Sequence, residues 1–149
     1  MGSARTLLIV NPAAGGGRAA RALDRVLEAL APLRPFDVFV TQPGLERPAE
    51  SAARDAVLAG ATRILVLGGD GSSSQALNGI YAAGGADALA RVSLGLLPAG
   101  TGRDYARSAG IPRDPVAAAR ALARGAAARR VDVGAINFPD GRTRLFLNV

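Results

Sequence analysis

The chain has 149 residues, of which 49% are hydrophobic, and carries a formal net charge of +6. This length predicts one domain with its own hydrophobic core, and no apolar run approaches the roughly 20 residues that span a bilayer. The sequence contains no Cys and no His, which excludes disulfides, thiolate or imidazole metal ligands, and catalysis by either side chain. Because all 18 basic residues are Arg, the Lys-dependent phosphate-binding loop of many nucleotide-binding proteins is excluded as well.

The positive charge has two interpretations. Arg18, Arg21 and Arg25 have the spacing of one helix face, which indicates a solvated arginine stripe. Alternatively, the arginines attract nucleotide phosphates or an acidic membrane surface. Aromatic residues make up only 4% of the chain and do not alternate with the arginines, which argues against a nucleic-acid partner. With no secretory signal at the start, we expect a cytoplasmic protein, and the charge permits peripheral contact with the inner membrane face.

Apolar runs of strand length alternate with Ala-rich segments of helical composition along the chain. The expected strands, each bounded by Gly, Pro or Asn, are residues 6–10, 36–40, 63–67, 92–97, 130–135 and 143–149. Five helices are expected. The first runs from the Gly15–Gly17 triplet to about residue 31, and the second covers residues 49–59. The third begins at Ser72 or Ser73 as a cap and ends at Gly84-Gly85, the fourth covers residues 103–109, and the fifth runs from Asp114-Pro115 to Gly125.

Strands that alternate with helices predict an α/β fold with a doubly wound, mostly parallel sheet flanked by helices. In such a sheet the loops after each strand emerge at the same edge, which is where ligands bind. Three glycine-rich loops follow the first, third and fourth expected strands. We therefore expect these loops to form one site. The last two strands are joined by a turn that contains Asp140-Gly141, a combination typical of hairpins.

The loop Gly68-Gly69-Asp70-Gly71-Ser72 carries the sharpest signal. Its glycines let the backbone approach a phosphate, and its amides, followed by a helix N-terminus, form an anion-binding site. Asp70 repels phosphate directly, so its presence makes sense if it orients a Mg²⁺-bound water or accepts a proton from an attacking hydroxyl. The alternative is a tight turn in which Asp70 caps the helix.

The third loop, Pro98 to Asp104, contains Gly100-Thr101-Gly102. Thr101 could donate to a phosphate or ribose oxygen, and Asp104 could cap the next helix or brace the neighbouring loop. An ordinary Pro-Gly loop is the alternative.

The first loop, Asn11 to Gly17, comes close to a dinucleotide fingerprint. However, the second strand ends in Thr41-Gln42 rather than in an acidic residue, which disfavours a hydride-transfer enzyme.

Together the three loops resemble the catalytic domain of diacylglycerol kinases, which bacterial lipid kinases and sphingosine kinases share. The resemblance rests on Asn11-Pro12 with its glycine loop, on Gly68 to Ser72, and on Pro98 to Arg107, in this order, and it runs from Leu7 to Val149. Gly-Gly-Asp-Gly alone also occurs in NAD kinases and phosphofructokinases, so the combination with Pro98 to Arg107 carries the specificity.

The resemblance implies that residues 1–149 are an ATP-binding α/β domain, and that a β-rich second domain, absent from this chain, supplies much of the lipid pocket and further carboxylates. ATP and Mg²⁺ would be bound, and the acceptor would be a lipid such as diacylglycerol. Asp70 would be the catalytic and metal residue. The implied nucleotide contacts are Asn11, Pro12, Ala13, Ala14, Gly15, Thr41, Gly68, Gly69, Asp70, Gly71, Ser72, Ser73, Ser74, Gly100, Thr101 and Gly102.

Three positions depart from the family pattern: Ala14 replaces Ser or Thr, Gln75 replaces Glu, and Arg103 replaces Asn. An inactive nucleotide-binding module is therefore the alternative to a lipid kinase, and a NAD kinase is a further alternative.

Overall fold

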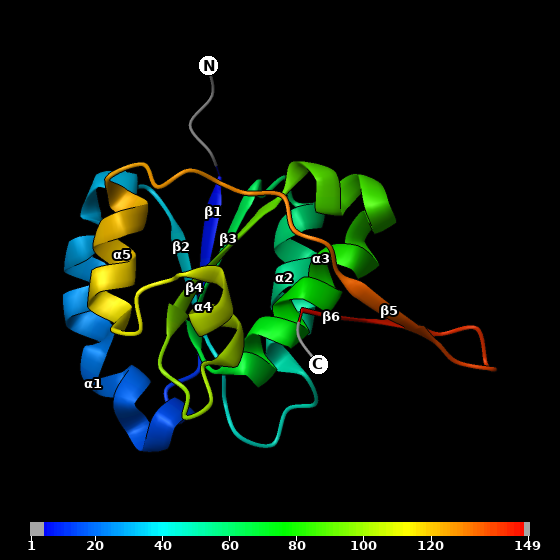
Figure 1. Cartoon of the computed structure of the whole chain (residues 1–149), viewed down its shortest axis with the longest axis horizontal. Helices are drawn as coiled ribbons and strands as arrows, with labels where there is room; N and C mark the ends of the chain where they lie inside the picture. The colour runs from blue at the N-terminus through cyan, green and yellow to red at the C-terminus, as the bar shows by residue number, and fades with distance from the viewer. Residues whose placement is uncertain (1–4, 148–149) are drawn as a thin grey trace.

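The computed structural model describes residues 5–147 and confirms the expected α/β class, with a mostly parallel sheet between two layers of helices (Figure 1). All four strands of the main sheet are parallel, in the order β2-β1-β3-β4. They are β1 (Thr6–Val10), β2 (Asp37–Val40), β3 (Arg63–Gly68) and β4 (Ser93–Pro98). The helices are α1 (Ala14–Ala29), α2 (Pro48–Leu58), α3 (Asp70–Arg91), α4 (Asp104–Ala109) and α5 (Pro115–Ala123), with a short 3-10 turn at Ala31–Leu33.

Alternate residues of the strands face opposite helix layers, as a buried parallel sheet requires. On one face Leu8 and Leu65 pack with α1 and α5, and on the other Ile9 and Ile64 pack with α2 and α3. These four side chains are completely buried. Both faces of β1 and β3 are therefore apolar, which explains the continuous hydrophobic runs in the sequence.

The strand order reverses beside β1. The chain leaves β1 through α1 to the edge strand β2, and then returns past β1 through α2 to β3. In an open parallel sheet this reversal leaves a crevice at the carboxyl ends of the two central strands. Here the crevice lies between the loops that follow β1 and β3.

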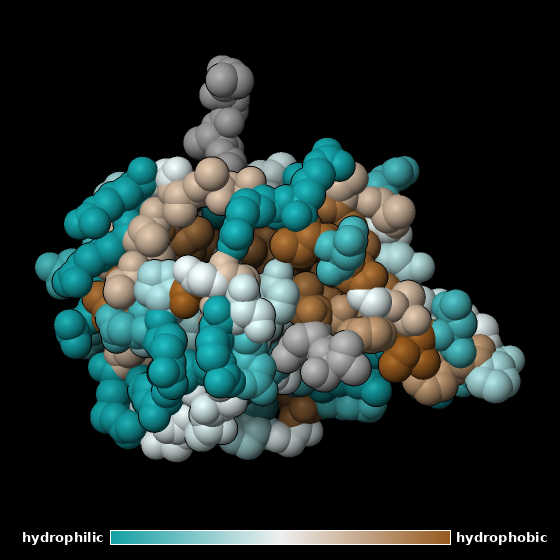
Figure 2. Space-filling view, viewed as in Figure 1, coloured by the Kyte–Doolittle hydropathy of each residue, from teal (hydrophilic) through white to brown (hydrophobic). Residues whose placement is uncertain are grey.

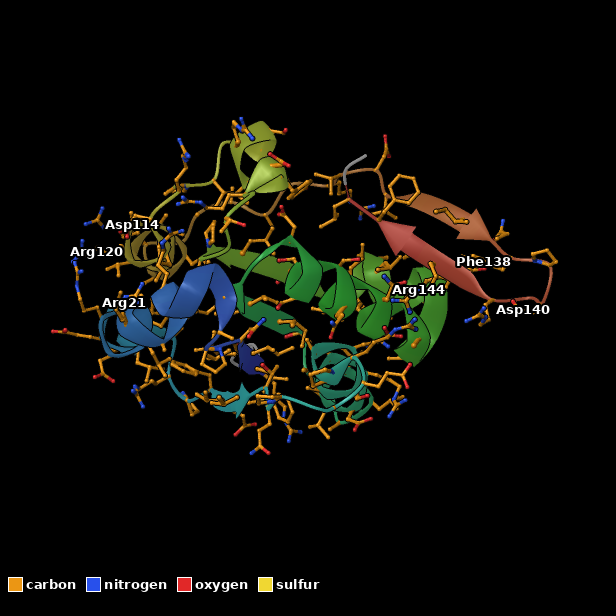
Figure 3. The ribbon with its side chains drawn as sticks, turned by 90° about the horizontal axis from the view of Figure 1, so that it is seen from below. Arg21, Asp114, Arg120, Phe138, Asp140 and Arg144 are labelled. Carbon is orange, nitrogen blue, oxygen red and sulfur yellow. The ribbon has the colours of Figure 1, made fainter. Side chains whose placement is uncertain are left out.

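The last two strands form a separate antiparallel hairpin, β5 (Gly134–Asn137) and β6 (Thr143–Phe146). It extends away from the body of the domain, with Phe138 and Asp140 at its far end (Figure 3). The space-filling view shows hydrophilic side chains at the outer edge beside α1, and apolar ones near α3 and the base of the hairpin (Figure 2). The predicted turn is confirmed, since Gly141 has φ +85° and the Phe138 amide donates to the Arg142 carbonyl at 2.8 Å.

Two side chains of the main domain hold β6. The amide group of Asn78 on α3, which is buried, exchanges two hydrogen bonds with the Leu145 backbone, at 2.8 and 3.0 Å. Arg144 reaches both carboxylate oxygens of Glu50 on α2, at 2.8 and 2.9 Å. These contacts imitate strand pairing and fix the hairpin to α2 and α3 (Figure 3).

Several predicted boundaries were wrong. The helix expected to end at Gly84-Gly85 does leave helical geometry there, but a further helical segment that the sequence did not predict continues to Arg91, with Ala88 buried in the core. The strand expected over 130–135 begins only at Gly134, since the preceding residues have no partner strand among the described residues.

The Asp114 cap is confirmed, because its carboxylate accepts the Ala117 amide at 2.9 Å. Within residues 5–147, no helix combines the length and apolar character needed to cross a bilayer.

Candidate functional site

The structure brings the three glycine-rich loops together at the carboxyl edge of the sheet. They surround an open cleft of about 340 Å³. Ten residues line it, all of them among the predicted nucleotide contacts: Asn11, Ala14, Gly15, Gly69, Asp70, Gly71, Ser72, Gly100, Thr101 and Gly102. The cleft lies at the reversal of strand order, where the fold predicts a ligand.

The loops pack backbone against backbone. A Cβ atom added to Gly100 would lie 2.6 Å from the Gly69 Cα, and one added to Gly15 would lie 2.0 Å from the Ala99 carbonyl oxygen. Real Cβ atoms do not come this close to backbone atoms, so these glycines are needed for the loops to meet. The glycine content of the loops therefore has a structural cause besides the predicted approach to phosphate.

Gly71 has no such structural cause. It is exposed, lines the cleft as the second residue of α3, and an added Cβ would meet nothing within 4 Å. Its φ is also not positive. Glycine in a helix costs up to about 1 kcal/mol relative to alanine. The fold therefore gives no reason for glycine at this position.

The N-terminus of α3 opens into the cleft without a side-chain cap. The helix begins after Gly69, not at a capping Ser72 or Ser73 as predicted. The Ser73 amide donates to the Gly69 carbonyl at 3.1 Å, but the amides of Asp70, Gly71 and Ser72 have no acceptor among the described residues. Three amides without an acceptor and the positive end of a helix that runs unbroken as far as the kink at Gly84 are features that favour an anion at this end of the cleft.

Asp70 lies at the first position of α3 and is half-buried. One carboxylate oxygen accepts the Asp104 backbone amide at 3.3 Å, so Asp70 links the second loop to the third. The predicted bracing between these loops therefore exists, but it uses the backbone of Asp104. The Asp104 side chain instead forms an ion pair with Arg107 on the surface of α4.

The first loop holds the second through Asn11. Its side-chain amide donates to the Ser72 hydroxyl at 3.1 Å, and its side-chain oxygen accepts the Ala13 amide at 3.2 Å. The residues Gly15–Gly17 follow with φ values of +63°, +66° and +88°, so only glycine fits there without strain. The amides of Gly15 and Gly16 have no acceptor among the described residues. Successive free amides are typical of anion-binding turns, and of these two residues Gly15 lines the cleft.

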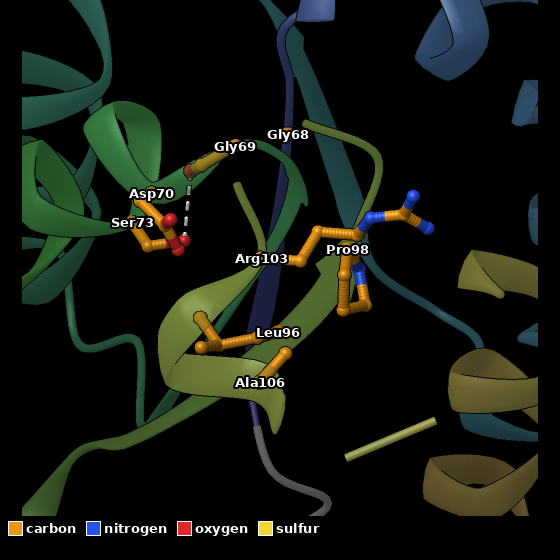
Figure 4. A pocket seen from close by; sticks show the side chains of 8 residues that line it. All are labelled: Gly68, Gly69, Asp70, Ser73, Leu96, Pro98, Arg103 and Ala106. Atoms are coloured by element: carbon orange, nitrogen blue, oxygen red, sulfur yellow. Dashed lines mark hydrogen bonds between the residues drawn. The ribbon is translucent and has the colours of Figure 1, made fainter. Parts of the chain in front are cut away.

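Arg103 neither enters the cleft nor blocks it. Its side chain runs along Pro98 and away from Asp70 (Figure 4), and one terminal nitrogen donates to the Arg113 carbonyl at 3.1 Å. The Arg103 Nε is buried without a hydrogen bond to the described residues, and its backbone is left-handed, with φ +55°. Asn, the usual family residue here, tolerates this backbone conformation better than Arg does.

Six predicted contacts lie outside the lining of the cleft. Gly68 and Ser73 instead line a much smaller neighbouring cavity, together with Arg103 and Leu96 (Figure 4). Thr41 is buried, and its amide donates to the Val10 carbonyl at 2.8 Å. The remaining three are Pro12, Ala13 and Ser74.

Sequence reasoning missed two side chains that shape the site. Arg18, interpreted as part of a solvated stripe, is half-buried and donates to the Gly100 carbonyl at 3.2 Å. Gln75 accepts the Ala49 amide at 3.2 Å and so stabilises the start of α2. Gln75 was named only as a departure from the family pattern, and nothing in the sequence signalled its contact with α2. The proximity of Arg18 to the glycine triplet was the only signal for Arg18.

The described residues contain no group of three or more His, Cys, Asp or Glu side chains that could hold a metal. Mg²⁺ is commonly bound by one or two carboxylates together with substrate phosphates and water, so a single carboxylate beside the cleft is compatible with it. Asp70 is the carboxylate that lines the cleft.

Comparison with known proteins gives one consistent result. Residues 5–136 match the family described as "Diacylglycerol kinase catalytic domain". The chain is 30% identical over 133 residues to a diacylglycerol kinase of Bacillus subtilis, and 34% identical over 139 residues to one of Mycobacterium tuberculosis, covering 89% and 93% of this chain. It spans 42% of the length of each of these two proteins.

Solved structures show the same likeness. A diacylglycerol kinase from Bacillus anthracis superposes with a TM-score of 0.68 at 27% sequence identity, covering 80% of this chain and 42% of that one. The likeness in structure therefore covers a similar share of the relative as the likeness in sequence does.

Proposed function

Because the chain belongs to the diacylglycerol kinase catalytic domain family, we propose that it is the nucleotide-binding domain of an ATP-dependent lipid kinase. The observation that carries this proposal is the uncapped N-terminus of α3, where three free amides and an exposed Gly71 face the cleft. A phosphate chain would satisfy these donors, which find no acceptor among residues 5–147.

The reaction would move the γ-phosphoryl group of ATP to a lipid hydroxyl. The bond between the γ-phosphorus and its bridging oxygen breaks, a bond to the hydroxyl oxygen forms, and the hydroxyl proton leaves. Phosphoryl transfer needs mainly positioning and charge stabilisation, which backbone amides supply. The amides of the second loop would hold the phosphates, and the Thr101 hydroxyl would donate to a phosphate or ribose oxygen.

Asp70 would serve the metal and the acceptor. When bound, Mg²⁺ would neutralise phosphate charge. The hydrogen bond from the Asp104 amide fixes the Asp70 carboxylate beside the cleft, where it would hold the metal or accept the hydroxyl proton.

The lipid would require a second domain. The residues that line the cleft are glycines, one alanine and small polar residues, so no large apolar side chain is present there to hold an acyl chain. The chain also spans only about two fifths of the length of the relatives. We therefore assign acceptor binding to protein outside residues 1–149, and expect this chain alone to bind nucleotide without transferring phosphate.

An inactive nucleotide-binding module is the second candidate, and Ala14 favours it. Ala14 lines the cleft, so the hydroxyl donor that the family usually places there is missing. Gln75 supports the inactive module less strongly. Its side-chain oxygen accepts the Ala49 amide at the start of α2, and a Glu side chain could accept the same hydrogen bond.

The test is transfer of labelled γ-phosphate by the full product of the gene, with Mg²⁺ and vesicles containing diacylglycerol or a sphingoid base. NAD serves as an acceptor in a parallel reaction. We expect label in a lipid, and loss of that label in Asp70→Asn. Asp87→Asn is the matched control, since Asp87 is an exposed residue on the same helix. ATP binding without label in any lipid would favour the inactive module, and label in NAD alone would favour a NAD kinase.

A further inference from the structure

We infer that Arg18 is a positioning residue that turns the Thr101 amide toward the nucleotide. This inference rests on the proposed function and adds a residue that is not among the predicted contacts. Arg18 follows the glycine triplet of the first loop, and its guanidinium group donates to the Gly100 carbonyl of the third loop at 3.2 Å, across 82 positions of sequence.

The hydrogen bond orients one peptide unit. The single cis peptide bond among the described residues is Arg34-Pro35, so the bond between Gly100 and Thr101 is trans. In a trans peptide the carbonyl and the following amide point in opposite directions. When Arg18 holds the Gly100 carbonyl, the Thr101 amide therefore points to the side opposite Arg18.

That opposite side is the cleft. Gly100 and Thr101 both line the cleft, whereas Arg18 does not. The Thr101 amide has no acceptor among the described residues, so it is free to donate to a phosphate. With the peptide reversed, the carbonyl oxygen would face the phosphate instead and repel it.

The charge of Arg18 is available for this role. No Asp or Glu within the described part of the chain forms an ion pair with it. Arg18 and the contact of Gly15 with Ala99 together join the first loop to the third. Because the chain has no Lys, a guanidinium group has to supply any fixed positive charge beside these loops.

The experiment compares Arg18→Met with Arg25→Met in the 149-residue chain. Both variants remove one positive charge from α1, but Arg25 is exposed and makes no hydrogen bond among the described contacts. ATP affinity is measured by calorimetry, and the Thr101 and Gly71 amides are followed by nitrogen-15 NMR during the titration. Unfolding of each variant by urea shows whether affinity is lost in a folded protein.

We expect Arg18→Met to weaken ATP binding roughly tenfold, the effect of a charge-assisted hydrogen bond, and to abolish the shift of the Thr101 amide while the Gly71 amide still responds. Arg25→Met should bind like the wild type, and Arg18→Lys, which keeps a charged donor, should recover most of the affinity. If Arg18→Met does not fold, Arg18→Leu, which also has no donor, carries the same expectation.

Two results would overturn the inference. One is an Arg18→Met variant that binds ATP within a factor of about two of the wild type. The other is an equal loss of affinity in Arg18→Met and Arg25→Met, because that would indicate net charge rather than position. A wild-type chain that binds no ATP would instead refute the proposed function, and the inference with it.

Discussion

Replacing Gly71 by Ala separates the needs of the fold from those of a ligand. An added Cβ at Gly71 meets nothing within 4 Å, and the residue lies in the first turn of α3. Alanine is the better helix former, so we expect the free energy of unfolding to rise by about 0.5 kcal/mol. In a helix the Cβ atom leans toward the N-terminus, so the new methyl group would point toward the free amides that hold the phosphate.

The expected loss of ATP affinity follows from these amides. A hydrogen bond from an amide to a charged phosphate oxygen contributes about 1.5–3 kcal/mol, and 1.4 kcal/mol corresponds to roughly a tenfold change in affinity. Displacing one such bond should weaken ATP binding between about ten- and a hundredfold. Calorimetric titration with ATP gives the affinity, and urea denaturation gives the stability.

Gly100→Ala is the control with the opposite effect on stability. Its Cβ would lie 2.6 Å from the Gly69 Cα, so two backbone segments would have to separate, at a cost of about 1–3 kcal/mol. A Gly71→Ala variant that binds ATP as well as the wild type would refute the placement of phosphate at α3. A Gly71→Ala variant that is clearly less stable would refute the structural argument for this glycine.

Three further changes test other contacts. Asp70→Asn removes a carboxylate but keeps an oxygen for the Asp104 amide, so the free energy of unfolding should change by less than about 1 kcal/mol. Calorimetry should show ATP binding that no longer depends on Mg²⁺, and retained Mg²⁺ dependence would contradict the metal role. Asn78→Ala leaves the amide and carbonyl of Leu145 unpaired and should cost about 2–4 kcal/mol in urea denaturation; a smaller loss would mean that β6 does not depend on Asn78. Asp114→Ala removes the cap of α5 and should lower the free energy of unfolding by about 1 kcal/mol; an unchanged value would mean that the cap is dispensable.

The main sheet could be predicted because its signals are local. The apolar runs at Thr6–Val10 and Arg63–Gly68 are long enough for a strand and are bounded by turn residues, and both strands are buried. The edge strand β2 is apolar but only partly buried, since Val38 and Val40 are 44% and 45% exposed. The parallel order then follows from the alternation of strands with helices, and it places the three loops at one edge.

The errors arose where distant residues decide local structure. The helix breaks at Gly85, which has φ +60°, but a further helical segment follows, and its Ala88 packs against residues that are distant in sequence. Ser72 is of a residue type that often caps helices, but its hydroxyl accepts a hydrogen bond from Asn11 in another loop. Arg18 fits an exposed stripe by its spacing, and only the fold brings it to Gly100.

The lining of the cleft could be predicted more completely than the contacts within it. The glycine motifs identified all the residues that line the cleft, but they did not reveal that Gly15 and Gly100 are required for packing between loops. A motif records which residue types occur, whereas the reason for each glycine depends on neighbours that are remote in sequence.

The most direct test of the account is the structure of this protein with Mg²⁺ and a non-hydrolysable ATP analogue. We predict phosphates within hydrogen-bonding distance of the Gly71 and Thr101 amides, with the metal beside Asp70. A nucleotide bound elsewhere on the chain, or none bound at saturating concentration, would contradict the assignment of the three loops as the ATP site.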